Sequence, residues 1–315
     1  MLCGVILLLA RPAWGQQGDS VFVALATRLS SIQAVTGYEQ PLVDTVLSLL
    51  PGGRRDRAGN ARFELGGGRP KRLLVCPLDE PGYVVGNIRD DGYLTLRRVP
   101  GHSGPLFDQQ LEGQRVTIQA RTLVPGVVAV RSIHLTRGRA GPGELPFTVD
   151  DAYVDVGASS RTQVARLEVR ILSPVTLAKH PHRYGKDLLA APSVGRRTAC
   201  AAVLLAIQQS RVRSRLLQPV IVAFVVEQEL SRRGLGTVAN ELGPFDETVV
   251  VDATRDRSDG IHVEPDSMSK AQWPALGRVS RWTLPVRYAG TPVESVAMHD
   301  ADSLRAALVR WIGGQ

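Results

Sequence analysis

The chain has 315 residues, and its 38 Lys and Arg residues outnumber its 30 Asp and Glu residues, which gives a formal net charge of +8. Hydrophobic residues make up 43 % of the chain, and only three cysteines are present. This composition supplies a sizeable core and excludes a disordered chain, a coiled coil and a small disulfide-rich scaffold.

The excess of basic residues raises the question of a nucleic-acid partner. The arginines occur as scattered pairs along the chain, and aromatic residues account for only 5 % of it. A nucleic-acid interface would gather basic residues in one patch and interleave aromatic side chains for stacking. We therefore expect a solvated basic surface and no nucleic-acid partner.

The first fifteen residues have the pattern of an export signal. Residues 2–10 form the small or apolar run LCGVILLLA, and Ala13 and Gly15 are the small residues of a cleavage site before Gln16. The run is too short to cross a bilayer as a helix, which takes about 20 residues. We expect that residues 1–15 are removed and that the mature protein is exported, periplasmic or secreted, with no membrane association after cleavage.

Residues 16–81 and 171–315 alternate helix and strand patterns. Apolar spacing predicts helices over 20–32, 41–50, 197–209, 231–242 and 303–312, and continuous apolar runs predict buried strands over 72–76, 217–226, 248–251 and 282–288. Residues 82–170 instead carry short β-rich runs such as YVVGNI and QRVTIQA, separated by turn signals such as DDG and GPG. The sequence therefore predicts an α/β domain interrupted by an inserted all-β domain at 82–170.

Two cysteines, Cys76 and Cys200, would remain in the mature chain. In an oxidising compartment they could form a disulfide. Each lies within an apolar run, VC at 75–76 and TACAAVLLAI at 198–207. We therefore expect two small buried hydrophobic residues instead of a disulfide.

Acidic residues follow three of the predicted buried strands. Asp79 and Glu80 follow the first, residues 227–229 (Glu-Gln-Glu) follow the second, and Asp252 ends the third. The carboxyl ends of parallel strands meet at one edge of a sheet, so these side chains are expected to converge. Convergent carboxylates need a cation or a proton, and a metal ion is the usual solution. The alternative is that each polar residue caps the next helix.

The order of sequence blocks resembles that of a known family. Residues 72–101, RLLVCPLDEPGYVVGNIRDDGYLTLRRVPG, resemble the metal-motif strand and the following β segment of the glutamyl-aminopeptidase family, the dinuclear zinc enzymes that include the tetrahedral and deblocking aminopeptidases. Later blocks follow in the same order: QRVTIQA, PGVVAV, YVDVGASSRTQ, APSVGRRTACAAVLLAI, VAFVVEQELSRRG, VVVDATRD and LPVRYAGTPVESV. The resemblance covers most of residues 20–315. It implies a zinc-peptidase-like α/β/α sandwich with an inserted barrel-like domain, and assembly into oligomers.

Carried over position by position, most of the family's metal ligands are absent. The first ligand, the His of a His-x-Asp pattern, falls on Pro77, while the orienting Asp remains as Asp79. The bridging carboxylate of a Leu-Asp-Asp-Arg block falls on Gly195, and the last His of an Arg-Tyr-x-His block falls on Gly290. Proline and glycine offer no side-chain ligand.

The resemblance also locates the general base and two surviving ligands. In the family two adjacent glutamates serve as base and ligand, and here these positions hold Gln228 and Glu229. The Asp ligand after the next strand matches Asp252. Because an amide cannot take a proton near neutral pH, Gln228 cannot act as the base. Glu229 and Asp252 are then remnants of a ligand set.

The vacated site needs positive charge if its acids converge without a metal. Arg196, beside the lost bridging position, could pair with Asp79, Glu229 and Asp252 in a forked geometry, or it could point to solvent. A histidine pair, His180 and His182, could in principle rebuild a metal site. We interpret that pair, together with its basic neighbours, as a solvated loop.

These departures favour binding over catalysis. We expect an exported homologue that holds no cofactor, binds a peptide or partner protein, and forms a homo- or hetero-oligomer. The alternative is a residual metal-dependent aminopeptidase or hydrolase with a rebuilt site, which would hold zinc or cobalt. Only 31 residues separate Asp252 from Leu284, where the family carries a longer segment with a substrate loop, so we expect part of the specificity pocket to be missing.

Overall fold

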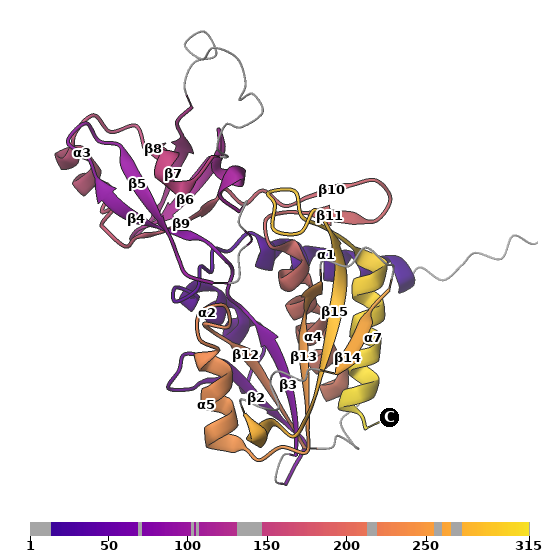
Figure 1. Ribbon diagram of the computed structural model, residues 1–315. Coiled ribbons are helices and arrows are strands. Elements are labelled where there is room, and N and C mark those ends of the chain that lie inside the picture. The colour runs from indigo at the N-terminus through magenta and orange to yellow at the C-terminus, as the bar shows by residue number, and fades with distance from the viewer. Residues whose placement is uncertain are drawn as a thin grey trace, which may run out of the picture.

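The computed structural model describes residues 14–314 apart from 69–70, 102–103, 105–106, 131–146, 213–218, 255–259 and 266–272. It has two parts, a layered domain built on a large sheet and a small closed barrel that projects beyond one end of that sheet (Figure 1). The predicted export signal lies outside the described residues up to position 13, and helix α1 (Trp14–Ser30) begins directly after them. No helix in the described part is both long enough and apolar enough to cross a membrane.

The central strands of the large sheet are parallel. β12 (Val220–Val225) pairs with β3 (Arg72–Pro77), β3 pairs with β13 (Glu247–Thr254), and β13 pairs with β15 (Arg278–Arg287). All six residues of β12 are buried, as expected for a strand covered on both faces. β3 and β13 include the whole of the strands predicted at 72–76 and 248–251. β12 lies within the predicted range 217–226, and β15 overlaps the predicted range 282–288.

Shorter antiparallel strands extend the sheet on both sides. The full order is β1-β2-β12-β3-β13-β15-β16-β11-β10, with β14 also paired to β15. The outer strands are β1 (Arg54–Arg55), β2 (Ala61–Leu65), β10 (His182–Tyr184), β11 (Leu188–Ala190), β14 (His262–Pro265) and β16 (Ser295–Ala297).

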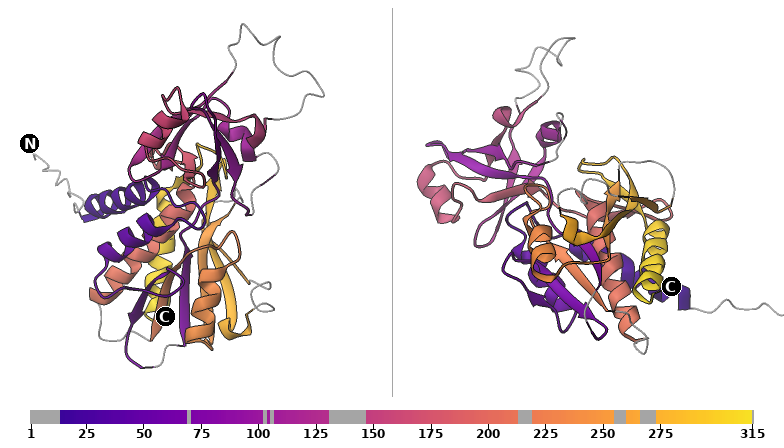
Figure 2. Two further views of the ribbon diagram at one scale, coloured as in Figure 1. Left: turned by 90° about the vertical axis from the view of Figure 1, so that its left-hand side faces the viewer. Right: turned by 60° about the horizontal axis from the view of Figure 1, so that its bottom comes forward.

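Helices cover both faces of the sheet, which gives the predicted α/β/α sandwich (Figure 2). Along β3, Leu74 and Cys76 share a core with four helices, whereas Leu73 and Val75 face the opposite core, because side chains alternate along a strand. The first core holds α1, α2 (Gln40–Leu49), α4 (Val194–Val212) and α7 (Met298–Ile312), and the second holds α5 (Arg233–Leu242) and η4 (Pro274–Leu276). α1, α2, α4 and α7 begin one to six residues before their predicted starts, and α5 begins two residues after its own.

The inserted segment folds as a closed six-stranded barrel of order β4-β5-β8-β7-β6-β9 with its own apolar core. Its last strand has four residues and lies beyond position 170, the predicted end of the insertion. The elements are β4 (Tyr83–Ile88), β5 (Leu94–Arg98), η1 (Phe107–Leu111), β6 (Arg115–Gln119), β7 (Leu123–Val128), η3 (Val149–Asp151), β8 (Tyr153–Asp155), α3 (Arg161–Arg166) and β9 (Pro174–Leu177).

Cys76 and Cys200 form a disulfide, so the prediction that they stay unpaired was wrong. Both side chains are fully buried, as predicted. The pairing arises because α4 packs on the face of the sheet to which Cys76 points, which brings the two Cα atoms to 5.7 Å. The bond joins the end of β3 to the first half of α4, and the whole barrel lies in the loop that it closes.

Candidate functional site

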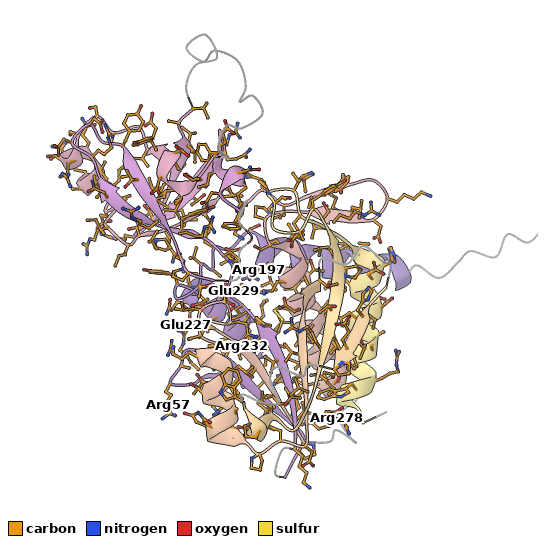
Figure 3. The ribbon with its side chains drawn as sticks, in the orientation of Figure 1. Arg57, Arg197, Glu227, Glu229, Arg232 and Arg278 are labelled. Atoms are coloured by element: carbon orange, nitrogen blue, oxygen red, sulfur yellow. A yellow bond between two sulfur atoms is a disulfide. The ribbon has the colours of Figure 1, made fainter. Side chains whose placement is uncertain are left out.

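The parallel strands deliver the predicted acidic residues to one edge of the sheet. β12 and β3 run in register from Val220 opposite Arg72 to Val225 opposite Pro77, and β13 lies on the other side of β3. Asp79 and Glu229 follow the first two strands and Asp252 lies near the end of the third. Figure 3 shows Glu229 and Arg197 at this edge, where the barrel meets the layered domain.

Arg196, in the first turn of α4, lies between the three carboxylates. Its Nε and Nη2 form a fork with Asp252, at 2.9 Å to Oδ1 and 3.1 Å to Oδ2. Nη2 is also 2.8 Å from Glu229 Oε1. Nη1 is 3.6 Å from Asp79 Oδ1 and donates to the Asp79 carbonyl oxygen at 2.8 Å. Of the two orientations considered from the sequence, the structure therefore has the inward one.

Burial alone would lower the pKa of Arg196, but Asp252, Asp79 and Glu229 together raise it well above its ordinary value. The guanidinium is therefore a permanent cation, and each of its three nitrogens has an oxygen of these residues within 3.1 Å. A forked guanidinium suits this role because it donates in fixed directions to several carboxylates at once.

Asp79 is the most enclosed of the three acids. Its side chain is fully buried, and its Oδ2 accepts from Thr36 Oγ1 at 3.0 Å and from the Glu229 backbone N–H at 2.8 Å. Burial raises the pKa of Asp79, and Arg196 opposes that shift. Thr36 was not predicted as a site residue from the sequence.

A second buried charge network lies next to the first. Glu80 Oε2 is 2.5 Å from Lys179 Nζ and 3.2 Å from Arg197 Nη2, and all three side chains are at most 3 % exposed. Burial would raise the pKa of Glu80, but Lys179 and Arg197 lower it. The interpretation of the segment around His180 as solvated is correct for His180, which is exposed, and wrong for Lys179. Lys179 turns inward, where it gives the buried Glu80 carboxylate a second cationic partner beside Arg197.

Glu294 joins two positions that hold metal ligands in the resembled family. Its Oε1 accepts from the Gly195 backbone N–H and its Oε2 from the Gly290 backbone N–H, each at 2.9 Å. Burial raises the pKa of Glu294, and these two hydrogen bonds counter the shift. One carboxylate thus fixes the main chain at both glycines. Glu294 was not predicted from the sequence.

Neither glycine position suits a ligand side chain, Gly195 for lack of space and Gly290 because of its backbone. A Cβ atom at Gly195 would lie 2.4 Å from Val286 Cγ1 and 2.7 Å from Ala253 Cβ, which is closer than real Cβ contacts. Gly290 has open space around it, but its φ of +71° lies in the left-handed region that side chains other than glycine rarely adopt. Pro77 ends β3 and supplies only its carbonyl group.

The residues of this site do not fit a dinuclear metal centre. Within the described ranges, no three His, Cys, Asp or Glu side chains are placed so that they could hold a metal ion. Glu229 and Asp252, which match metal ligands of the resembled family, already pair with Arg196, and a second cation between them would face the guanidinium charge. In this arrangement Arg196 occupies the place between the acids that a metal ion would need.

A carboxylate introduced at position 195 alone is not expected to create a metal site. We expect Gly195→Asp to lower the free energy of unfolding by about 1–3 kcal/mol, because the new side chain would overlap Val286 and Ala253, and to bind no zinc. Urea unfolding and metal analysis check this. Gly67→Asp is the control, since no atom lies within 4 Å of a Cβ at that position. A stable Gly195→Asp variant that holds zinc would contradict the expectation.

Gln228 does not contact the cavity that lies between the barrel and the carboxyl edge of the sheet. Its amide Oε1 is buried without a hydrogen-bond partner among the described atoms, and Gln228 does not line the cavity that Glu229 borders. The structure thus separates the residue in the base position from the acids that it would serve.

A cavity of about 170 Å³ opens between the barrel and the carboxyl edge of the sheet. Tyr83, Phe107 and Leu177 line its barrel side, and Tyr83 and Phe107 stack with their ring centroids 5.6 Å apart. Arg196 with its carboxylates and the segment 289–291 line the other side. Neither His180 nor His182 borders it. This cavity can take a small group with an apolar part and hydrogen-bonding ends.

Glu39 makes the region sensitive to pH. Burial raises the pKa of Glu39 to about 7, although the amides of Gly37 and Glu227 donate to it. A carboxyl whose pKa is raised on folding loses stability as pH rises from its unfolded value through its folded one. We expect the wild type to lose roughly 3 kcal/mol between pH 4 and pH 8 relative to Glu39→Gln. Urea unfolding across that range measures it, with exposed Glu112→Gln as the control, and parallel curves for wild type and Glu39→Gln would contradict it.

Comparison with known proteins places these features in a family. The model of the M42 glutamyl aminopeptidase family matches residues 59–271. The putative aminopeptidase SgcX of Escherichia coli (strain K12) is 27 % identical over 229 residues, which covers 70 % of this chain and 59 % of SgcX. Lysyl aminopeptidase of Pyrococcus furiosus is 26 % identical over 227 residues, 70 % of this chain and 63 % of the relative. The chain thus spans about three-fifths of the length of these relatives.

The solved structures agree on the fold. The TET1 peptidase of Pyrococcus horikoshii, which can assemble into a tetrahedron or a large octahedral shell, matches with a TM-score of 0.81 over 92 % of this chain and 99 % of its own, at 19 % identity. The aminopeptidase APDkam598 of Desulfurococcus kamchatkensis matches with a TM-score of 0.78 over 95 % and 96 %, also at 19 % identity. The resemblance inferred from the order of sequence blocks is confirmed, and the chain belongs to the M42 glutamyl aminopeptidase family.

Proposed function

We propose that this chain is a metal-free, non-catalytic member of its family that binds a peptide or a partner protein. The observation that carries the proposal is the position of Arg196, whose guanidinium contacts Asp79, Glu229 and Asp252. In an active dinuclear site a metal pair neutralises such acids and activates a water molecule. A guanidinium pairs with the acids and offsets part of their charge, but it cannot lower the pKa of a water molecule by coordination.

The remaining departures support the same proposal. The base position holds an amide that lies away from the cavity. Gly195 has no room for a side chain, and Gly290 has a left-handed backbone. At these two positions the local structure therefore suits glycine, by close packing at Gly195 and by backbone conformation at Gly290. The cavity remains, with an apolar barrel side and a polar sheet side, which is consistent with binding.

Export is part of the proposal. The sequence begins with the pattern of an export signal, and the folded domain contains a disulfide. Disulfides persist in oxidising compartments and are rare in the cytosol of most organisms. We place the mature chain in the periplasm or outside the cell.

Assembly is a further part of it. A structural neighbour forms tetrahedral and octahedral shells, and this chain shares that fold. We propose a homo-oligomer, or a mixed oligomer with an active family member. Light scattering and co-purification measure the two states.

Metal analysis of the purified mature chain tests the proposal. After dialysis against zinc or cobalt we expect well below one metal ion per chain, and no hydrolysis of aminoacyl-nitroanilides with either metal added. The same measurements on Glu229→Ala are the control and should give the same values. One or more ions per wild-type chain, lost in Glu229→Ala together with measurable hydrolysis, would overturn the proposal in favour of a hydrolase with a rebuilt site.

A further inference from the structure

Side chains of α4 contact three successive carbonyl groups after Cys76. Cys200 Sγ lies 3.3 Å from the Pro77 carbonyl oxygen, Arg197 Nη1 donates to that of Leu78, and Arg196 Nη1 donates to that of Asp79 at 2.8 Å. The end of β3 therefore lies along the first turns of α4.

The disulfide lies at the inner end of this row of contacts. Cys200 is one helical turn after Arg196, and Cys76 is three residues before Asp79. The same two segments are thus joined covalently at one end and by a guanidinium–carboxylate pair at the other. Both sulfur atoms lie in the core, with their residues fully buried.

The charges where the end of β3 meets the first turns of α4 favour a covalent link between these two segments. The first turn of α4 carries two arginines and no acidic residue. The amino end of a helix has a partial positive charge, so cations are unfavourable there. Arg196 and Arg197 therefore stay in place only while acidic residues face them, namely Asp79, Glu229, Asp252 and Glu80. Without the arginines, those acidic residues would repel one another. Each half of the network depends on the other being held close.

We propose that the Cys76–Cys200 disulfide is a clamp that holds Arg196 among its three carboxylates, and that a thiol–disulfide oxidant must install it before the site is complete. In a metal-loaded family member, coordination would bind these segments together; here the covalent bond does so. The clamp accounts for why a site without metal still keeps its acids together, and the inference does not depend on which ligand the cavity binds.

The oxidation balances as a thiol–disulfide exchange. The thiolate of one cysteine attacks the disulfide of the oxidant and expels a thiolate from it, which leaves a mixed disulfide. The second cysteine thiolate then attacks the protein sulfur of that mixed disulfide, forms the Cys76–Cys200 bond and releases the oxidant as a dithiol. The two cysteines lose two electrons and two protons, and the oxidant gains them. Because both sulfurs are buried in the folded chain, exchange precedes the packing of α4 on β3.

Thiol content tests the clamp without any variant. In protein recovered from an oxidising compartment, alkylation under denaturing conditions without reductant should label neither Cys76 nor Cys200, and mass spectrometry should find their two peptides linked. After reduction both should be labelled. Free thiols at both positions in that protein would overturn the proposal.

Hydrogen exchange tests the link to Arg196. In Cys76→Ala/Cys200→Ala, amides of residues 194–200 should exchange at least about tenfold faster than in the wild type, while the barrel strands β6 and β7 should be unchanged. Reduced wild-type protein is the second sample, in case the variant does not fold. Equal exchange at 194–200 in oxidised and reduced samples would overturn the clamp. Metal content measured on the same preparations keeps the two proposals apart, because a disulfide-bonded chain that binds zinc contradicts only the proposed function.

Discussion

Replacing Arg196 by alanine is expected to lower the free energy of unfolding at pH 7 by about 3–5 kcal/mol, the usual cost of leaving buried charges without their partner. The change leaves Asp79, Glu229 and Asp252 close together with no cation between them. Burial already raises the pKa of Asp79, and without Arg196 that pKa should rise further. Urea unfolding measures the loss.

The same variant should show a characteristic dependence on pH. A carboxyl with a raised pKa in the folded state keeps its proton there, so lowering the pH favours the folded state. The deficit of Arg196→Ala should therefore shrink as pH falls from 8 to 5. Arg196→Lys should recover part of the stability, since an ammonium lacks the fork. Arg97→Ala is the surface control, because Arg97 pairs with Asp150 in solvent, and its change should stay within about 0.5 kcal/mol. A deficit for Arg196→Ala as small as that of Arg97→Ala would show that the guanidinium does not bind these acids together.

Removing the disulfide is expected to cost about 5 kcal/mol, because the loop that it closes is long. The two cysteines are 124 residues apart in sequence, so the unfolded chain gains much freedom when the bond is absent. We expect Cys76→Ala/Cys200→Ala to unfold at a markedly lower urea concentration than oxidised wild type. Reduced wild type serves as the comparison that keeps both side chains, and it should fall near the variant. If reduction leaves the transition unchanged, the bond does not constrain the unfolded state.

Much of this fold could be predicted from the sequence because its elements are marked locally. The continuous apolar runs of β3, β12 and β13 indicate strands buried on both faces, and the change of texture after Gly82 indicates the insertion. The convergence of acids followed from one rule, that parallel strands end at the same edge.

The rest depends on contacts that no local pattern contains. The disulfide joins residues 124 apart, and the Lys179–Glu80 pair joins residues 99 apart. Burial in apolar runs correctly predicted that both cysteines are internal, but it could not show that they face each other. Lys179 looked like part of a basic loop because its partner lies across the barrel insertion. Glu294 could not be predicted because it binds main-chain amides, and every residue except proline offers such an amide.

The hydrogen bonds of Glu294 bear on how this lineage can change. Its two oxygens hold the main chain at Gly195 and Gly290, so under the proposed function the change from ligand to glycine involves the backbone as well as the side chains. Under the proposed function, a variant with a ligand side chain at only one of these positions would be overpacked at Gly195 or strained at Gly290, and it would gain no activity. Under the proposed function, a return to metal binding would thus require concerted changes at Gly195, Gly290 and Glu294.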